Sequence, residues 1–267
     1  MYLRKISVVC ATATLAMVSF LSQATVVEIR TSFGDIEVNL FDETTPETVE
    51  NFLSYVNSGA YANVIVHRSV SGFIIQSGGY AYVDPAAAGE VPLDAIETGP
   101  AINNEPVYSN LRGTIAMAKL SGSADSATSQ WFINLADNSS NLDTQNSGFT
   151  VFGQVTDDGM ETVDAIAAKA TVNLGGAFTD IPMENYTATD FANNVIIEEE
   201  NLVVISDVVV TDNTVASAAN LDPVENTLID ADTSTGGSSN SGGGGAFLWL
   251  SLLALCGSVR KLKLGFA

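Results

Sequence analysis

Cysteine and histidine are scarce in this sequence of 267 residues. The two cysteines, Cys10 and Cys256, lie in apolar segments at opposite ends of the chain. A disulfide framework in the central part is therefore excluded, and its stability must come from a packed core. The only histidine, His67, has no cysteine or carboxylate cluster beside it at ligand spacing, so we expect no metal site.

Positive charge is also scarce. Ten Lys and Arg residues stand against 31 Asp and Glu residues, which gives a formal net charge of -21 at pH 7. Half of the basic residues lie in the two terminal segments, at Arg4, Lys5, Arg260, Lys261 and Lys263. The acidic central part should repel nucleic acid and anionic membranes while remaining soluble. We therefore expect no nucleic-acid partner.

The first 24 residues have the organisation of a secretory signal peptide. Arg4 and Lys5 precede an apolar run over residues 6–21, and Ser22-Gln23-Ala24 supplies small residues at the cleavage positions. This pattern predicts cleavage before Thr25 and export of the remaining chain. An uncleaved membrane anchor is the alternative interpretation.

The opposite end has a different composition. Residues 213–245 are acidic and then rich in Gly and Ser, which predicts a flexible linker. Residues 246–267 comprise an apolar run followed by basic residues, which predicts a short hydrophobic helix with a basic end. The run is short for a membrane span, although the upstream glycines could extend it. We expect membrane contact only through this segment.

Between these ends the sequence favours many short strands and two helices. One helix should begin at Thr44 or Thr45 and end at Asn57-Ser58-Gly59, because Val49, Phe52, Leu53 and Val56 recur at helical spacing. The second should cover 159–170, and residues 80–105 should form a surface loop. Strands are expected at 25–30, 36–40, 113–118, 130–135, 149–155 and 202–210.

One apolar segment contains a charge that needs an explanation. Residues 66–79 read VHRSVSGFIIQSGG, so Arg68 stands almost alone among strand-forming residues. A buried charge without a partner is costly, and such a residue is therefore a candidate for function. Three further segments follow: LRGTIAMAK at 111–119, DSATSQWFINLADN at 125–138 and FTVFGQV at 149–155.

These four segments resemble, in order and spacing, the cyclophilin-type peptidyl-prolyl cis/trans isomerases in their bacterial exported form. The resemblance runs from about Thr25 to Thr211, so we take 25–212 as the isomerase domain. It implies a mainly β fold, a closed eight-stranded antiparallel β-barrel capped by two α-helices. It also implies activity on proline-containing polypeptides, without a cofactor or metal, by a chain that we expect to be monomeric.

The resemblance assigns a role to each site residue. Arg68 matches the catalytic arginine, which would stabilise the twisted amide, and Gln76 would bind the substrate backbone. The remaining substrate-binding positions, in the proline pocket and the adjoining groove, are Phe73, Ile74, Ala118, Gln130, Phe132, Leu142 and Phe149. A module that binds proline-containing peptides at the cell surface without turnover is the alternative function.

Some positions fall outside the catalytic assignment. The family has a structural histidine where His67 stands, and many members have Trp where Asn141 stands, so we expect weak binding of cyclosporin. The acidic run Glu198 to Glu200 is interpreted as a solvated insertion, with cation binding as the alternative.

The C-terminal segment has a resemblance of its own. Gly242 to Gly245, the apolar run and the basic end are similar to the glycine-glycine sorting tails that a rhomboid-type protease removes from some exported bacterial proteins. This predicts a periplasmic or cell-surface protein that is released after processing. A plain C-terminal anchor is the alternative.

Overall fold

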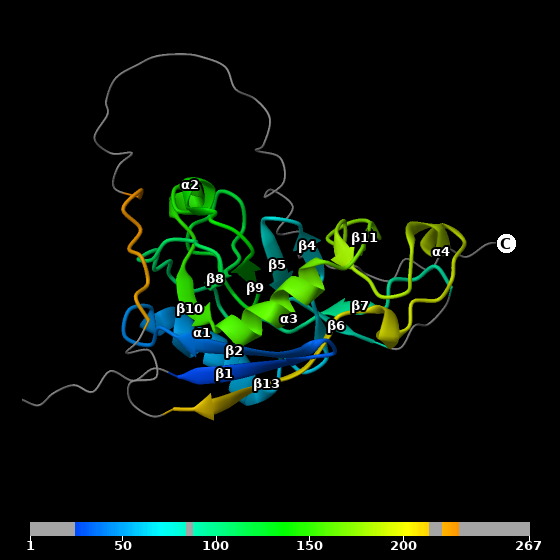
Figure 1. The fold of residues 1–267 in the computed structure, drawn as a ribbon, viewed down its shortest axis with the longest axis horizontal. Coiled ribbons are helices and arrows are strands. Elements are labelled where there is room, and N and C mark those ends of the chain that lie inside the picture. The colour runs from blue at the N-terminus through cyan, green and yellow to red at the C-terminus, as the bar shows by residue number, and fades with distance from the viewer. Residues whose placement is uncertain (1–24, 84–87, 214–220, 230–267) are drawn as a thin grey trace, which may run out of the picture.

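The computed structural model describes residues 25–83, 88–213 and 221–229 (Figure 1). Its main feature is one antiparallel sheet with the strand order β4-β5-β9-β8-β10-β2-β1-β13-β3-β6-β7, and a separate pair is formed by β11 and β12. The sheet strands are β1 (Val26–Thr31), β2 (Gly34–Leu40), β3 (Val64–Ile65), β4 (Arg68–Val70), β5 (Ile74–Ser77), β6 (Tyr80–Tyr82), β7 (Leu93–Ala95), β8 (Thr114–Met117), β9 (Trp131–Asn134), β10 (Val151–Val155) and β13 (Val204–Asp212).

The predicted closed barrel of eight strands is wrong in strand number and in closure. Eleven strands form the described sheet, and its end strands β4 and β7 do not pair with each other. The reason lies at Val66 and His67, where the amide of Val66 donates to Val203 and the amide of His67 donates to Gln76. The hydrogen-bonding partner of the chain thus changes within two residues, from the segment that leads into β13 to β5. The sheet therefore curls without a continuous closing strand.

Helix α1 (Pro46–Ser58) follows the predicted amphipathic pattern. Val49, Phe52 and Val56 are buried, and Gly59 ends the helix with a φ of 70°, a conformation that glycine adopts without steric cost. The predicted cap is only partly correct, because Thr45 occupies the N-cap position but its hydroxyl donates to the carbonyl of Phe41.

The amides at the start of α1 are bound instead by a carboxylate from a distant loop. Glu105 accepts hydrogen bonds from the amide of Thr48 at 2.9 Å and from its hydroxyl at 2.7 Å. A carboxylate in this position satisfies free N–H groups and complements the positive end of the helix dipole. Glu105 therefore joins α1 to the loop before β8.

Helix α3 (Asp157–Ala167) begins two residues before the predicted start, because the hydroxyl of Thr156 accepts from the amide of Gly159. Met160, Val163 and Ile166 are buried, as the periodicity predicts, and the helix packs against β2. Both α1 and α3 contribute to the main hydrophobic core, which also takes residues from β1, β2, β8, β9 and β13.

A second hydrophobic core lies at one end of the sheet, on the right in Figure 1. It joins β6 and β7 to β11 (Thr171–Val172), β12 (Ile181–Pro182) and α4 (Ala188–Ala192), and its members Ile197 and Leu202 flank the 3-10 helix η2 (Glu199–Asn201). The predicted loop over 80–105 is therefore wrong where β6 and β7 form. The acidic run Glu198 to Glu200 extends into η2, between the buried residues Ile197 and Leu202.

Residues 221–229, which we name the strap, fall inside the predicted flexible linker but pair with the domain. The amide of Ser109 donates to Val224, and the amide of Asn226 donates to Val107. Tyr108 and Glu225 form an antiparallel bridge between the two segments. In Figure 1 the strap is the orange segment. Nearby lie α2 (Ser139–Leu142) and the 3-10 helix η1 (Gln145–Ser147).

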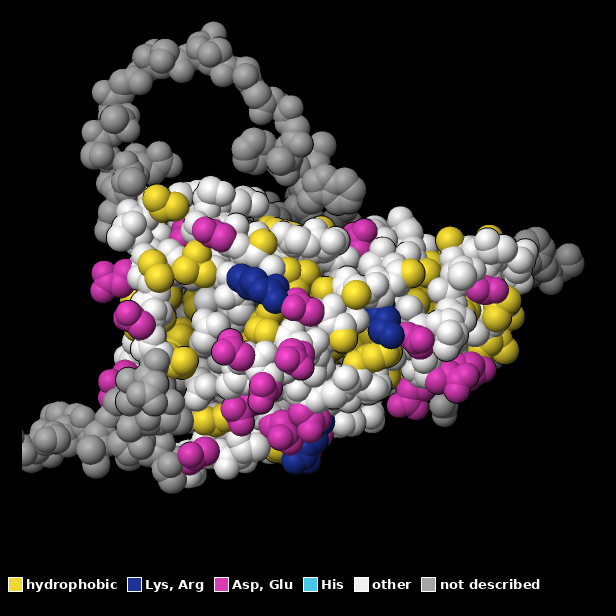
Figure 2. Space-filling model, viewed as in Figure 1, with side chains coloured by type: hydrophobic (Ala, Val, Ile, Leu, Met, Phe, Trp, Pro, Cys, Tyr) yellow, Lys and Arg dark blue, Asp and Glu magenta, His cyan; other side chains and the backbone are white. Residues whose placement is uncertain are grey.

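The predicted signal peptide and the predicted hydrophobic tail both lie outside the described residues. Within the ranges that the structure describes, no helix is long and apolar enough to cross a membrane. The described surface carries many more acidic than basic side chains on the face in Figure 2, in keeping with the composition.

The remote cap gives a test of the fold. Replacing Glu105 with Ala leaves the amides of Glu47 and Thr48 without their acceptor, and we expect the free energy of unfolding to fall by about 1–2 kcal/mol. Chemical denaturation measures the change. Glu97→Ala, which removes an exposed carboxylate from the same loop region, is the matched control and should have a much smaller effect. Equal stability of the two variants would contradict the capping role.

Candidate active site

Four neighbouring strands place the key residues in one row. Arg68 on β4 lies opposite Gln76 on β5, Gln76 lies opposite Phe132 on β9, and Phe132 lies opposite Ala116 on β8. Directly paired residues point to the same face of a sheet. The positive charge, the amide and the aromatic ring therefore share one face.

The alternate residues of these strands point to the opposite face. Ile75, Ile133 and Ile115 are paired with one another and belong to the main core. The first face carries a separate apolar group, which we name the outer cluster: Phe41, Ile74, Ala116, Ala118, Phe132, Leu142, Phe149 and Val151. The site thus lies outside the main core, and its apolar side chains are those of the outer cluster.

The outer cluster brings together the predicted apolar site residues. It contains Ile74, Ala118, Phe132, Leu142 and Phe149, and the half-buried ring of Phe73 packs against it. The rings of Phe132 and Phe149 meet edge to face, with their centroids 5.8 Å apart. This arrangement is favoured between aromatic rings and holds both in fixed orientations.

Arg68 and Gln76 lie beside the outer cluster with unused hydrogen-bonding capacity. Arg68 is only 7% exposed, and among the described residues its Nη1 has no hydrogen-bond partner. Gln76 is fully buried; its Nε2 donates to Oε1 of Gln130 at 2.8 Å, whereas its own Oε1 has no partner among the described residues. Buried polar atoms without partners are costly, so these two atoms have hydrogen-bonding capacity that the described residues do not use.

The hairpin β11–β12 supports the strand of Arg68, a contact that the sequence did not predict. The amide of Ser69 donates to the carbonyl of Asp180 at 2.7 Å. Burial lowers the pKa of Arg68, and the negative charge of Asp180 opposes this effect. These residues are more than 100 positions apart in the chain, and no periodic pattern marks the hairpin.

Tyr80 connects the second core to the active-site strand. Its ring lies edge to face with His67 at 5.0 Å and with Phe178 at 4.8 Å, measured between centroids. Burial, together with the positive charge of Arg68, lowers the pKa of His67 to about 3. An imidazole that is neutral throughout the physiological range, enclosed by packing, supports the structural role expected for His67.

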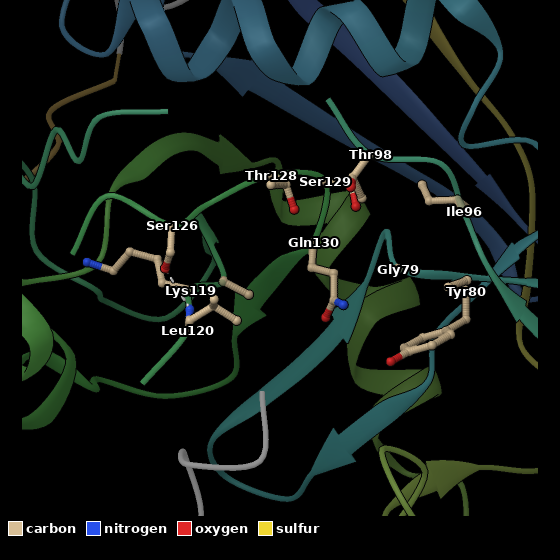
Figure 3. Close-up of a pocket in the computed structure, with 12 residues that line it drawn as sticks. Gly79, Tyr80, Ile96, Thr98, Lys119, Leu120, Ser126, Thr128, Ser129 and Gln130 are labelled. Atoms are coloured by element: carbon tan, nitrogen blue, oxygen red, sulfur yellow. Dashed lines mark hydrogen bonds between the residues drawn. The ribbon is translucent and has the colours of Figure 1, made fainter. Parts of the chain in front are cut away.

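A hollow of about 170 Å³ adjoins Gln130 (Figure 3). Figure 3 shows Gln130 between Tyr80 on one side and Leu120 on the other, with Thr128 and Ser129 above it. Only Gln130 and Ala118 of its lining residues were predicted as site residues. Gly79 allows this arrangement, because a Cβ at that position would lie 2.6 Å from Nε2 of Gln130.

Lys119 contacts Phe149 and the residues that precede it. Its Nζ donates to the carbonyls of Gly148 at 2.5 Å and Asn146 at 2.9 Å, and it lies 4.8 Å from the centre of the Phe149 ring. Burial lowers the pKa of Lys119 to about 8. The ammonium group therefore fixes the loop that carries Phe149.

Among the described residues, no group of three His, Cys, Asp or Glu side chains is arranged to bind a metal ion.

The depressed pKa of His67 predicts a dependence of stability on pH. In the unfolded chain the imidazole takes up a proton near its usual pKa of 6.5, whereas folded His67 stays neutral down to about 3. Stability is therefore lost as pH falls from 6.5 towards 3, by about 1.4 kcal/mol per pH unit from this group alone. His67→Gln should show a shallower decline in unfolding free energy between pH 7 and pH 4. Parallel declines in the two proteins would contradict the assignment.

Comparison with known proteins identifies the family. The sequence profile described as "Cyclophilin type peptidyl-prolyl cis-trans isomerase/CLD" matches residues 26–190. Peptidyl-prolyl cis-trans isomerase A of Dickeya dadantii is 43% identical over 156 residues, which cover 57% of this chain and 76% of the relative. Peptidyl-prolyl cis-trans isomerase B of Escherichia coli is 40% identical over 163 residues, covering 60% and 93% of the two chains.

Similar chains also occur among solved structures. The crystal structure of a cyclophilin-type isomerase from Cryptosporidium parvum is 23% identical, covers 72% of this chain and 99% of its own, and has a TM-score of 0.49. The family profile extends over more than half of the chain and includes every predicted site residue. On this match, together with the two bacterial relatives, the chain belongs to the cyclophilin-type peptidyl-prolyl cis-trans isomerase family.

Proposed function

We propose that this protein accelerates the cis/trans isomerisation of X-Pro bonds in polypeptides, with Arg68 as the catalytic residue. The observation that carries the proposal is the buried Arg68 guanidinium with an unused donor, on the same sheet face as the outer cluster. The activity named for the D. dadantii and E. coli relatives supports the same reaction.

The reaction requires no bond to be made or broken. Rotation about the X-Pro bond is slow because amide resonance opposes it, with a barrier of roughly 18–20 kcal/mol. At the top of the barrier the amide is twisted, and its nitrogen lone pair is no longer delocalised into the carbonyl. A donor directed at this nitrogen binds the twisted amide better than the planar one, and such differential binding is what accelerates a reaction.

The site contains the parts that this mechanism needs. The proline ring would pack on Phe132, Leu142 and Phe149, which are buried and fixed by their neighbours. Arg68 would donate from beside that ring, where burial strengthens the interaction relative to water. Oε1 of Gln76 would accept from a substrate amide, because the hydrogen bond to Gln130 uses Nε2 and leaves this oxygen without a partner among the described residues.

The hollow beside Gln130 extends the site along the bound chain. Its lining by Tyr80, Ile96 and Thr98 offers both apolar and hydroxyl surface to a substrate residue near the proline. Substrates would therefore be extended polypeptide segments rather than free proline. We propose that the domain acts on them as a monomer.

The central test is a protease-coupled isomerisation assay on a proline-containing tetrapeptide. Arg68→Ala removes the donor that favours the twisted amide, and we expect kcat/KM to fall by about 10²–10³-fold without a change in the circular dichroism spectrum. Arg68→Lys should recover only part of the loss, because an ammonium lacks the planar guanidinium geometry. Arg30→Ala, which removes an exposed arginine paired with Glu28, is the matched control and should retain full activity.

Two results would contradict the proposal in different ways. Unchanged turnover in Arg68→Ala would mean that the catalytic assignment is wrong. A wild-type chain that binds the tetrapeptide but leaves the isomerisation rate at background would be the non-catalytic binding module.

We further propose that the protein is exported and acts in the periplasm or at the cell surface. The support is sequence composition alone: the signal-like residues 1–24, and the glycines, apolar run and basic end of residues 242–267. In this proposal the C-terminal segment is the only part that contacts a membrane, and its removal releases the enzyme.

Intact-mass analysis of the exported protein tests both cleavages. We expect a chain that begins at Thr25 and lacks the residues from Ala246 onwards. A mass that includes residues 246–267 would exclude tail processing and favour a retained anchor. A mass that includes residues 1–24 would exclude cleavage of the signal peptide.

A further inference from the structure

We propose that Asn226 is a positioning residue, and that through it the strap forms part of the support of the proline pocket. This proposal rests on the function proposed above. Asn226 is only 7% exposed, whereas its neighbours Glu225 and Thr227 are exposed. Asn226 is the one buried side chain in a segment whose other residues are exposed or half-buried, which indicates a specific contact rather than general packing.

Both polar atoms of the Asn226 side chain are used. Its Oδ1 accepts from the amides of Leu228 and Ile229, each at 3.1 Å, which forms a local turn. Its Nδ2 then donates to the main-chain carbonyl of Asp143 at 3.0 Å. The turn fixes the side chain, and the fixed side chain holds Asp143.

Asp143 directly follows the pocket residue Leu142 and leads to the other side of the pocket. Its fully buried carboxylate accepts from the amide of Asn110 at 2.8 Å and from Nδ2 of Asn110 at 3.0 Å. The same Nδ2 donates to the carbonyl of Phe149 at 3.2 Å, and the amide of Phe149 donates to Leu142 at 2.9 Å. One polar network therefore runs from Asn226 to the backbone of both pocket residues.

The strap lies close to this part of the site at two more points. A Cβ on Gly148, the residue before Phe149, would lie 3.3 Å from Nδ2 of Asn226 and 2.9 Å from the carbonyl of Asp143. At the other end of the strap, the half-buried side chain of Leu221 packs against the outer cluster. The strap thus makes one apolar contact with the outer cluster and one polar contact with the chain that follows Leu142.

The expected kinetic effect follows from the role of Leu142 and Phe149. A surface that holds the proline ring binds the planar and the twisted amide about equally, so loosening it raises KM and leaves kcat nearly unchanged. Loss of the Arg68 donor, in contrast, lowers kcat. The split between KM and kcat therefore separates positioning by Asn226 from catalysis and from general loss of folded protein.

The experiment uses the full chain with Asn226→Ala and Asn226→Asp. Asn226→Asp keeps the acceptor of the local turn but lacks the donor to Asp143, so both variants should raise KM for the proline tetrapeptide ~3–10-fold with kcat within ~2-fold of wild type. Hydrogen exchange at the amides of Phe149 and Asn110 should become ~10-fold faster, while that of Ile133 in β9 stays unchanged. Val224→Ala, at a 55% exposed position on the same strap, is the matched control and should match wild type in both measurements.

Each outcome decides the proposal. Unchanged KM and unchanged exchange at Phe149 in Asn226→Asp would overturn it, and so would a loss confined to kcat. If Asn226→Ala does not fold, Asn226→Asp alone gives the result. If the wild-type chain has no isomerase activity, the proposed function fails. The positioning role is then decided by hydrogen exchange alone. Faster exchange at Phe149 and Asn110 in Asn226→Asp supports that role, and unchanged exchange overturns it.

Discussion

The alternation of side chains along β5, β9 and β8 is the constraint on which the whole molecule depends. Each strand directs one set of side chains into the main core and the other set into the site, so Ile75 and Ile133 stabilise the sheet while Gln76 and Phe132 form the groove. A slip of one residue in the pairing would exchange the two faces. Stability and function are therefore specified by the same register.

Two parts of the structure reach the site from outside the four segments that resemble the family, at 66–79, 111–119, 125–138 and 149–155. The second core extends the sheet through β6 and β7 and reaches the active-site strand through Tyr80. The strap reaches the opposite side, where Asn226 contacts the loop that follows Leu142. Neither part supplies the donor or the aromatic rings assigned to the reaction, so both influence the site through the residues that they contact.

Sequence reasoning succeeded where a local pattern was sufficient. Helical spacing gave α1 and α3 to within a few residues, and five residues predicted from the ordered segments lie together in the outer cluster: Ile74, Ala118, Phe132, Leu142 and Phe149. It failed where contacts are distant. Three contacts were missed in this way: Glu105 caps α1, Asp180 lies beside Arg68, and Asn226 holds the chain after Leu142. Each of these residues lies in a loop without periodicity. A polar residue in a loop gives no signal of its partner. The open sheet was missed because the pairing changes at Val66 and His67, inside one continuous apolar run.

The pairing of β1 with β13 has a consequence for how the protein acquires its fold. Val27 lies opposite Val210, so the first strand of the domain pairs with a strand that is separated from it by almost the whole domain in sequence. Contacts of such long range are slow to form, and an unpaired strand edge is prone to aggregation in the meantime. In a chain made from its N-terminus, β2 can pair with β10 first, but the outer edge of β1 stays without its partner until β13 is available. The edge of β1 is therefore the part of the sheet that stays open for the longest time while the chain is being made.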